Sequence, residues 1–409
     1  HQGRFFYVVS SHLEGDYELW RRPVDGSDAW SSYGGPRVHL HMERIFAFAD
    51  YLVVLGREAG LRQVWVKATA GPGEDWHRVS LPGEAAVIHL EENREYAGTR
   101  LRLGYCSLDM PYAVLSYDMA RRSIRVEKES PVGGDFESRN YVSRRLLAEA
   151  SDGAQVPISL VYREDLRRPE GHPVVLYTYG AYGYCLEPEF DPARLSLLDR
   201  GVIFAMAHVR GGGELGVPWR EAGRLGRKRN SFSDCIACAE HLLRTGYAAK
   251  GRVALMGDSA GGLVVGAVLN MRPELFAAAV TDCPFVDVLD TLSDPSLPLS
   301  VSDWEEFGNP ADPDVRAYIR SYSPCDNVRP QDYPALYVTA GFQDPRVAFW
   351  EPAKWVDLLR RHTRSQRPIV FEVDLEAGHW GTPGQLGYYR DLARKYAFLL
   401  SWLAPDASV

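Results

Sequence analysis

Residues 252–276 read RVALMGDSAGGLVVGAVLNMRPELF and say most about the fold of the second part of this chain. It begins with an apolar run typical of a buried strand, passes through Gly257-Asp258-Ser259-Ala260-Gly261, and continues as an apolar segment typical of a helix. A serine on so sharp a strand-to-helix turn needs small neighbours, which explains the flanking glycines. The sequence therefore predicts a nucleophile elbow that presents the Ser259 hydroxyl at the carboxyl edge of a sheet.

An elbow serine needs two partners, because serine is a weak nucleophile at neutral pH. It requires a histidine base and an acid that holds the histidine in the right tautomer. In this kind of fold the three residues follow in the order serine, acid, histidine. Asp344 lies just after a predicted strand, and His379 lies after the next one. We therefore expect Ser259, Asp344 and His379 to form a catalytic triad.

Two other acidic residues lie close to these positions. Asp374 is a rival acid, but it ends the strand that leads to His379, so a structural role is expected. Asp258 precedes the nucleophile and is expected to be merely tolerated there, with tuning of the site as the alternative. There is no HExxH pattern and no second histidine at ligand spacing, so neither a metal nor a cofactor is expected.

Strands and helices alternate in the predicted structure from about residue 141 to the end. Strands are predicted at 156–162, 173–180, 201–209, 252–258, 276–283, 334–341 and 368–374, and helices at 231–246, 351–362 and 391–404. This alternation predicts a mostly parallel sheet covered by helices on both faces. Residues 141–409 are therefore expected to form an α/β-hydrolase domain.

The first part of the chain, from residue 1 to about 140, reads as short strands separated by polar turns. Strands around Leu19, Val64 and Leu115 recur at spacings of 45 and 51 residues, which suits four-stranded propeller blades. About three blades of a β-propeller are expected, with a plain β-sandwich as the alternative. Three blades cannot close a propeller, and the chain starts at His1 inside a predicted strand, so it is expected to be a fragment of a longer protein.

The composition is that of a globular protein, with 45% hydrophobic, 24% charged and 11% aromatic residues. A formal net charge of -8 speaks against a nucleic-acid partner, which would need a basic face. There is neither an apolar run of membrane-spanning length nor a recognisable signal peptide. Six scattered cysteines are too few for a disulfide-stapled scaffold, and the Cys235 and Cys238 pair on a predicted helix is expected to be core. A cytoplasmic protein without a membrane partner is expected, and its oligomeric state is not readable.

Longer stretches resemble the prolyl oligopeptidase family of serine peptidases, and within it the oligopeptidase B branch. The stretches are YTYGAYG at 177–183, RLSLLDRGVIFAMAHVRGGGELGVPW at 194–219, RPELFAAAVTDCPFVDVLDT at 272–291, EEFGNP at 305–310, SYSPCDNV at 321–328 and FWEPAKW at 349–355. The resemblance implies a seven-bladed propeller capping an α/β-hydrolase domain that cleaves short peptides. It also implies that about four blades lie outside this chain.

The resemblance extends to the groups that stabilise the oxyanion. The backbone N–H of Ala260 is expected to be one donor, and Tyr179 matches the tyrosine whose hydroxyl is the other. Donors aimed at a developing oxyanion stabilise the transition state by about 3 kcal/mol each. A packed tyrosine at the end of a strand is the alternative for Tyr179.

Acidic residues that match the family's specificity sites are the next expectation. Asp303 and Glu305 match a pair that holds Arg or Lys on the acyl side of the cut, although Asp303 replaces a glutamate. Glu187 and Glu189 match residues that receive the next basic side chain, and both replace aspartates. Two carboxylates suit the planar fork of a guanidinium. Solvated acidic loops are the alternative for either pair.

Two further residues carry expected roles in substrate binding. Arg346 matches an arginine that binds a substrate carbonyl, and Tyr182 matches an aromatic wall of the specificity pocket. Close relatives generally have glycine at the position of Asp258. The expected function is thus an oligopeptidase that cuts short peptides after Arg or Lys.

Three other functions stay open at this point. One is a carboxylesterase resembling the hormone-sensitive lipase family, whose elbow is also GDSAGG, although its HGGG motif is missing here. The second is a prolyl-specific oligopeptidase. The third is a binding module that has lost activity, against which the intact Ser259, Asp344, His379 and Tyr179 argue.

Overall fold

Two compact units make up the part of the chain that the structure describes. The computed structural model describes residues 3–11, 17–36, 40–69 and 75–403. The first unit holds the residues up to Arg139 together with Glu187–Asp191 and Gly213–Pro218, and the second unit holds the rest. The two short later segments carry no strand pattern, so the sequence does not predict that they belong with the first unit.

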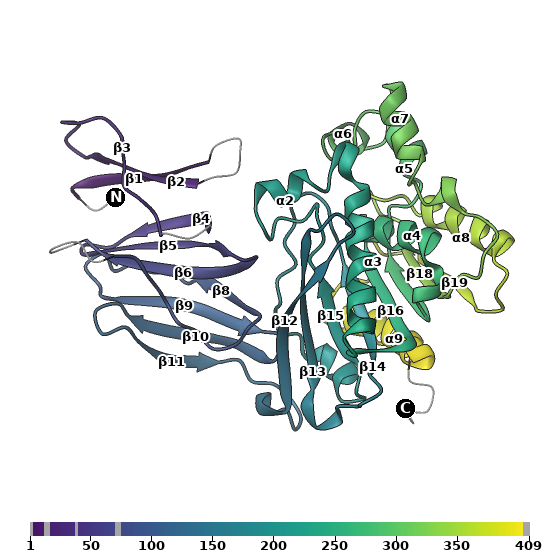
Figure 1. Ribbon diagram of the computed structural model, residues 1–409, viewed down its shortest axis with the longest axis horizontal. Helices are drawn as coiled ribbons and strands as arrows, with labels where there is room; N and C mark the ends of the chain where they lie inside the picture. Colours follow the sequence, from purple (N-terminus) through teal and green to yellow (C-terminus); the bar gives the residue numbers. More distant parts are fainter. Residues whose placement is uncertain (1–2, 12–16, 37–39, 70–74, 404–409) are drawn as a thin grey trace. The chain divides into compact units, whose positions relative to one another are not determined.

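Three antiparallel sheets form the first unit (Figure 1). They consist of β1 Phe5–Ser11, β2 Tyr17–Pro23 and β3 Ser31–Ser32; β4 Leu40–Ala47, β5 Tyr51–Glu58, β6 Leu61–Ala68 and β7 His77–Arg78; and β8 Ala86–Leu90, β9 Arg100–Ser107, β10 Met110–Asp118 and β11 Ser123–Glu129. Within each sheet the strands pair in sequence order. Leu19, Val64 and Leu115 are buried on β2, β6 and β10, each the last strand but one of its sheet. The sheets are propeller blades, which confirms the predicted all-β, partial-propeller architecture.

Local turns and apolar faces explain why these strands form. β5 and β6 are joined by Ala59 and Gly60, both with positive φ, as a two-residue hairpin turn requires. Inward-facing residues of neighbouring sheets then share one core, in which Val53 and Leu55 of β5 pack with Leu103 of β9. Burial of apolar side chains between sheets stabilises the stack.

An eight-stranded sheet is the centre of the second unit. Its strands are β12 Tyr141–Glu149, β13 Gln155–Arg163, β14 His172–Thr178, β15 Ile203–Ala207, β16 Ala248–Asp258, β17 Ala278–Asp282, β18 Ala335–Gly341 and β19 Ile369–Asp374, in the spatial order β12-β13-β15-β14-β16-β17-β18-β19. β12 and β13 run antiparallel to their neighbours, and the remaining pairs are parallel. The mostly parallel sheet confirms the predicted α/β-hydrolase fold, and β12 is a strand that the sequence analysis did not predict.

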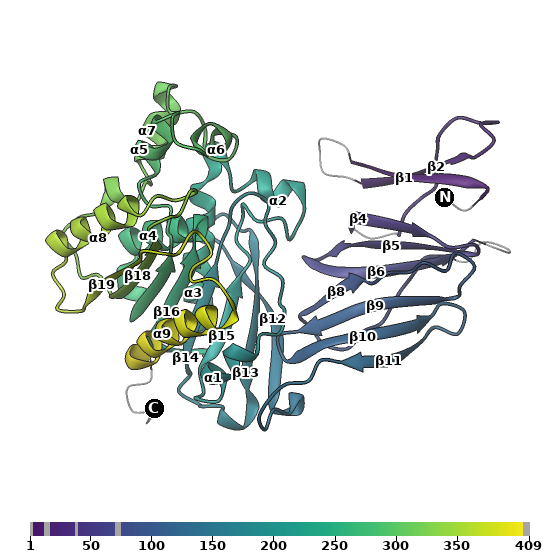
Figure 2. The same cartoon turned by 180° about the vertical axis from the view of Figure 1, so that it is seen from behind.

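Helices cover both faces of this sheet. The helices of the described residues are α1 Leu195–Leu198, α2 Val217–Glu221, α3 Arg229–Arg244, α4 Ala260–Met271, α5 Val288–Ser293, α6 Ser300–Phe307, α7 Pro313–Arg320, α8 Trp350–His362 and α9 Gln385–Leu403, and only some of them lie on the sheet. α3, α4 and α8 bury Phe232, Val264 and Trp355 in one core with the strands, on the face seen in Figure 1. α1 and α9 lie on the opposite face, which Figure 2 shows.

Three of these elements differ from the prediction or refine it. α9 begins at Gln385, six residues before the predicted start, and Ala404 lies outside the described residues. Cys235 and Cys238 are fully buried on α3, as expected of core residues.

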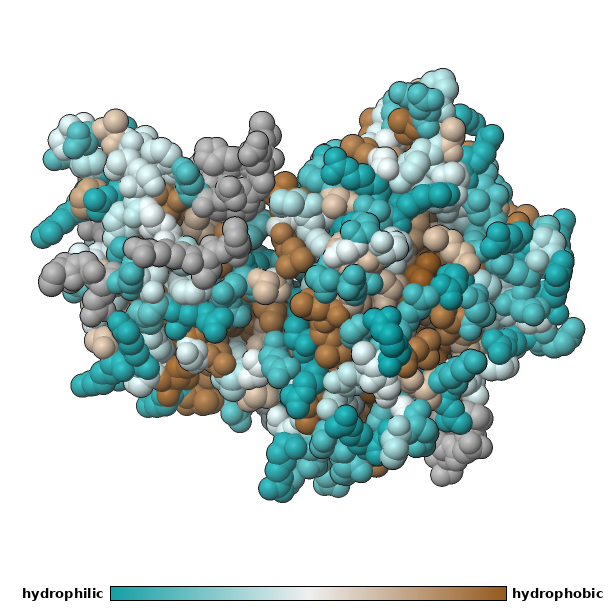
Figure 3. Space-filling model, viewed as in Figure 1, coloured by the Kyte–Doolittle hydropathy of each residue, from teal (hydrophilic) through white to brown (hydrophobic). Residues whose placement is uncertain are grey.

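α7 buries only Ile319, and hydrophilic side chains dominate the top of the second unit in Figure 3.

Within the described ranges, the structure has no helix whose length and apolar content would let it cross a membrane.

Candidate active site

The elbow joins β16 to α4. Ser259 has φ 54° and ψ -120°, a positive φ that is strained for any residue other than glycine. The surrounding atoms leave no room for side chains at the neighbouring glycines. A Cβ at Gly257 would lie 2.8 Å from the oxygen of Gly261, and a Cβ at Gly262 would lie 2.3 Å from the Cβ of Pro284. The glycines of this segment are therefore required by backbone packing.

Hydrogen bonds at both ends of Ser259 hold the strained turn. Its N–H donates to the carbonyl of Asp282 at 2.9 Å, which ties the elbow to the end of β17. Its carbonyl accepts from the N–H groups of Gly262 and Phe285, both at 2.9 Å. The strain, of order 1–3 kcal/mol, persists because these bonds over-determine the conformation.

Asp344 and His379 come together in loops that follow β18 and β19. His379 Nδ1 lies 2.7 Å from Asp344 Oδ2, and the two side chains are 5% and 0% exposed. Asp344 Oδ1 accepts from the N–H groups of Arg346 at 2.7 Å and Val347 at 3.0 Å. Burial alone would raise the pKa of Asp344, but the hydrogen bonds from His379, Val347 and Arg346 lower it below its ordinary value. The acid is therefore ionised where it meets the histidine.

The rival acid, Asp374, has other partners. Its Oδ1 accepts from the N–H groups of Glu376 at 2.8 Å and Ala377 at 3.1 Å. Its Oδ2 accepts from the Thr382 hydroxyl at 2.9 Å. These contacts bridge the two ends of the loop that carries His379, as expected of a structural residue.

The two expected oxyanion donors lie beside the elbow. Ala260 is the first residue of α4, where backbone N–H groups have no partner inside the helix. Burial raises the pKa of Tyr179, while the charge of Arg346 and a hydrogen bond with Ser259 act in the opposite direction. The ring of Tyr179 packs edge-on against that of Tyr184, with centroids 5.1 Å apart. A neutral hydroxyl that reaches the nucleophile suits an oxyanion donor.

Asp303 and Glu305 do not converge on one point. Both lie on α6, where residues two apart point in nearly opposite directions. Asp303 accepts from the Tyr182 hydroxyl at 3.2 Å. The Glu305 side chain is 73% exposed and pairs with Arg220 at 3.1 Å. The sequence analysis predicted no helix in this stretch and therefore treated Asp303 and Glu305 as a pair. The structure has a helix here, and the helix separates the two acids.

Glu306, the next residue of α6, is a candidate that the sequence analysis missed. It is three residues from Asp303 and so shares its side of the helix. It is 2% exposed, and both carboxylate oxygens are buried without a hydrogen-bond partner among the described residues. Fully buried Lys228 lies 3.5 Å away and donates to the Gly180 carbonyl at 2.6 Å. Burial lowers the pKa of Lys228 to about 8, against the opposing effect of Glu306.

Glu187 and Glu189 lie in the first unit and already have partners there. Glu187 pairs with the buried Arg57 and lies 3.6 Å from Arg62. Glu189 lies 3.4 Å from His89. Arg57 and Arg62 neutralise the charge of Glu187, and His89 lies beside Glu189. Such contacts are typical of solvated or structural acids rather than of a preformed pocket for a cation.

Arg346 and Tyr182 border the site. The guanidinium of Arg346 lies 5.7 Å from the ring centre of Trp380, whose side chain adjoins His379 with ring centroids 5.0 Å apart. Tyr182 adopts φ 60° and packs edge-on against Phe307 at 5.9 Å. Tyr182 thus forms an aromatic surface next to Asp303.

A buried charge cluster lies behind the nucleophile. Asp258 faces Asp282 across the β16–β17 ladder and accepts from the Tyr177 hydroxyl at 3.2 Å. Lys395 of α9 pairs with Asp282. Burial raises the pKa of Asp258 to about 6, with Lys395 lowering it and Asp282 raising it further. Asp258 thus belongs to a buried group of charged and hydroxyl side chains that adjoins the elbow.

Two groups of side chains in the described part of the chain come close enough to share a metal ion. They are His89, Cys106 and Glu189 in the first unit, and Cys283, Asp344 and His379 in the second. In the second group the Nδ1 of His379 already makes the hydrogen bond to Asp344. That group is thus accounted for by the triad geometry.

Comparison with known proteins shows which protein family and which proteins are similar to this chain. A sequence profile described as the prolyl oligopeptidase family matches residues 188–406. Dipeptidyl aminopeptidase BI of Pseudoxanthomonas mexicana is 37% identical over 402 residues, which cover 97% of this chain and 55% of that protein. Protease 2 of Moraxella lacunata is 38% identical over 392 residues, covering 96% and 56%.

A solved structure agrees with these relatives. Oligopeptidase B from Trypanosoma brucei, in a closed form with covalently bound antipain, superposes with a TM-score of 0.85 and 40% identity. The match covers 98% of this chain and 59% of that one. The match thus spans a little over half the length of each of these three proteins.

The buried carboxyl of Asp258 predicts a pH-dependent stability. The folded state binds this proton more tightly than the unfolded state, so the stability of the protein falls as pH rises from about 4 through 6. Asp258→Asn removes this titration. Relative to the unsubstituted protein, the variant should gain on the order of 2 kcal/mol between pH 4 and pH 8.

Thermal unfolding of both proteins across that pH range measures the effect. The difference in melting temperature should grow in favour of the variant as pH rises. A difference that is the same at every pH would mean that Asp258 is not protonated in the folded state near pH 5.

Proposed function

Because this chain belongs to the prolyl oligopeptidase family, we propose that it carries the catalytic domain of a serine peptidase that cleaves short peptides through an acyl-enzyme. The observation that carries the proposal is the 2.7 Å contact between His379 Nδ1 and the buried Asp344. A histidine held in one tautomer by an ionised acid is the base that an elbow serine requires.

The proposed reaction uses side chains and backbone of the second unit. His379 takes the proton of Ser259, whose oxygen attacks the peptide carbonyl. The N–H of Ala260 and the hydroxyl of Tyr179 stabilise the oxyanion, and His379 then protonates the leaving amine. A water molecule activated by His379 releases the acyl group from Ser259.

We further propose cleavage after Arg or Lys, as the resemblance to oligopeptidase B implies. Asp303 supports this specificity, because burial raises its pKa and a bound cation would stabilise its charged form. Glu306 shares one side of α6 with Asp303, since residues three apart lie on the same face, but it is buried against Lys228, so Asp303 is the acid proposed to contact the cation. The exposed Arg346 is proposed to bind a substrate carbonyl, and Tyr182 to contact the aliphatic part of the basic side chain.

The location and the partners are part of the same proposal. Short peptides with basic residues are the proposed substrates, and the cytoplasm is the proposed location. The five buried cysteines, Cys106, Cys235, Cys238, Cys283 and Cys325, are free thiols, which supports a reducing compartment.

A dipeptidyl aminopeptidase is the second candidate, because one similar protein bears that name. Such an enzyme requires a free N-terminus two residues before the cut, whereas an endopeptidase accepts a blocked one. The prolyl-specific and esterase alternatives differ in the residue or bond that they accept.

Hydrolysis of matched chromogenic peptides distinguishes these functions. We expect an N-terminally blocked peptide ending in Arg to be cleaved at least 100-fold faster than peptides ending in Pro or Phe, since neither neutral residue can pair with Asp303. Ser259→Ala should abolish the activity. Cleavage of only the unblocked dipeptide substrate would establish the aminopeptidase, and cleavage of a simple acyl ester without any peptide would contradict the peptidase.

The acidic residues of α6 predict a charge-specific effect. Asp303→Asn should lower kcat/KM for the Arg peptide by about 10- to 100-fold, the loss expected for one buried charge-assisted contact. Glu305→Gln should change it less than about threefold, because Glu305 is exposed and pairs with Arg220.

The same peptide with citrulline in place of Arg is the control, since citrulline has the shape of arginine without its charge. Neither variant should affect its hydrolysis. A larger loss with Glu305→Gln than with Asp303→Asn would reverse the assignment.

A further inference from the structure

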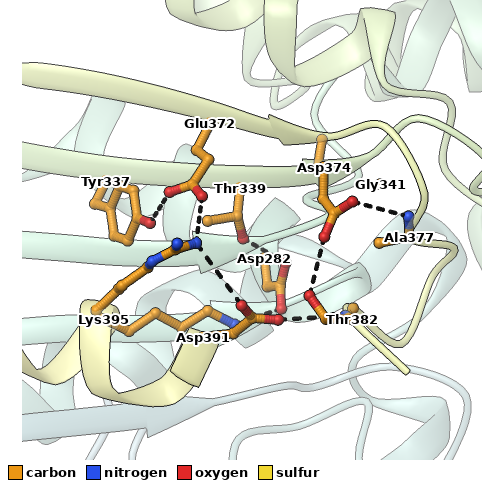
Figure 4. A pocket seen from close by; sticks show the side chains of 13 residues that line it. Asp282, Tyr337, Thr339, Gly341, Glu372, Asp374, Ala377, Thr382, Asp391 and Lys395 are labelled. Carbon is orange, nitrogen blue, oxygen red and sulfur yellow. Dashed lines mark hydrogen bonds and ion pairs between the residues drawn. The ribbon is translucent and has the colours of Figure 1, made fainter. Parts of the chain in front are cut away.

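A polar cavity lies behind the proposed triad, between α9 and the carboxyl ends of β17, β18 and β19 (Figure 4). Charged and hydroxyl side chains line it, among them Asp374, Thr382 and Asp391. The cavity contains none of the three triad side chains, but its wall includes both ends of the loop that carries His379. Its contacts therefore bear on how that loop is held.

Asp374 connects the two ends of this loop. Its Oδ1 accepts from the N–H groups of Glu376 and Ala377 at the start of the loop, at 2.8 and 3.1 Å. Its Oδ2 accepts from the hydroxyl of Thr382 at the end, at 2.9 Å. A single carboxylate thus links the two ends of the seven-residue segment 375–381. We call the contacts of Asp374 with the Thr382 hydroxyl and the two N–H groups the clasp.

Thr382 is anchored a second time. Its N–H donates to Asp391 Oδ2 of α9 at 3.2 Å, and Figure 4 shows Asp374, Thr382 and Asp391 converging in the cavity. α9 is itself fixed to the sheet, because Arg394 pairs with Glu372 at 2.6 Å. The end of the loop is thereby tied to a rigid element.

Apolar packing does not explain how the loop keeps its shape. Leu375 and Trp380 are 66% and 82% exposed. Ala377 is buried, and its carbonyl accepts from the N–H of Gln343 at 3.0 Å. Polar contacts therefore provide most of the restraint on the loop.

We propose that Asp374 and Thr382 are positioning residues whose clasp holds the loop 375–381 so that His379 stays on Asp344 and within reach of Ser259. Neither residue touches the reacting atoms. The proposal rests on the proposed function for its kinetic consequence, because a misplacement of about 1 Å at a catalytic group can cost about 100-fold in rate.

The ionisation of Asp374 suits this role. Hydrogen bonds from the Glu376 N–H and the Thr382 hydroxyl lower the pKa of Asp374 below its ordinary value. The carboxylate therefore keeps its acceptor atoms over the neutral pH range.

The test compares three variants. Thr382→Val removes the clasp hydroxyl and keeps the size of the side chain, and Thr382→Ser restores the hydroxyl. Thr339→Val is the matched control, because the Thr339 hydroxyl donates to Asp282 in the same cavity but not to the loop. For each variant, kcat and KM on the Arg peptide, the melting temperature and the far-downfield proton signal of His379 Nδ1–H are measured.

We expect Thr382→Val to lower kcat by about 10- to 100-fold with KM within about twofold. Thr382→Ser and Thr339→Val should stay within about threefold of the unsubstituted protein. Both valine variants should lower the melting temperature by similar amounts. The Nδ1–H signal should weaken in Thr382→Val alone, since only there does the contact with Asp344 loosen.

Two results would overturn the proposal. One is an equal loss of kcat in Thr382→Val and Thr339→Val, which would mean that the clasp contributes to the stability of the protein and does not position His379. The other is an unchanged Nδ1–H signal in Thr382→Val. The signal does not depend on turnover, so it decides the question even if the protein proves not to cleave peptides.

Discussion

The positive φ of Ser259 is the constraint on which the site depends. A residue with a side chain holds this conformation only where the surrounding backbone enforces it, and here the hydrogen bonds to Asp282, Gly262 and Phe285 do so. The close approach of Thr178 and Pro284 then excludes side chains at Gly261 and Gly262. Because the turn needs β17 beside β16, the position of the nucleophile is a property of the whole parallel sheet rather than of five residues.

The carboxyl ends of the parallel strands collect the other groups at the same edge. Asp344 follows β18 and His379 follows β19, so neighbouring strands deliver the acid and the base side by side. Beneath them α9 supplies Asp391 and Lys395, which contact the histidine loop and the end of β17. A helix near the end of the chain thus braces both the nucleophile strand and the loop of the base. The pKa values of the buried acids Asp282 and Asp344 are lowered by such partners, whereas one oxygen of Asp258 has no hydrogen-bond partner among the described residues and the pKa of Asp258 rises.

Sequence predicted what is local in this protein. The elbow glycines, the strand before them, and the order of Ser259, Asp344 and His379 follow from spacing, and every predicted strand of the second unit is present. The specificity acids were harder to predict, because α6 is a short helix between strands and its geometry separates Asp303 from Glu305. Two other contacts between distant segments left no signal in the sequence. Glu187 pairs with Arg57, 130 residues away, and Lys228 approaches Glu306 across 78 residues, so only folding brings them together. The i, i+3 spacing of Asp303 and Glu306 would have pointed to Glu306 had the helix been recognised.

The proposed mechanism requires that Ser259 forms a covalent acyl-enzyme with His379 as its base. Intact-mass and peptide-mass analysis after reaction with a peptidyl-arginine phosphonate ester tests it most directly, because such reagents trap the activated serine. We expect one adduct, located on Ser259, that forms at a much lower rate in His379→Ala. An adduct on another residue, or rapid peptide cleavage with Ser259 unmodified, would contradict it.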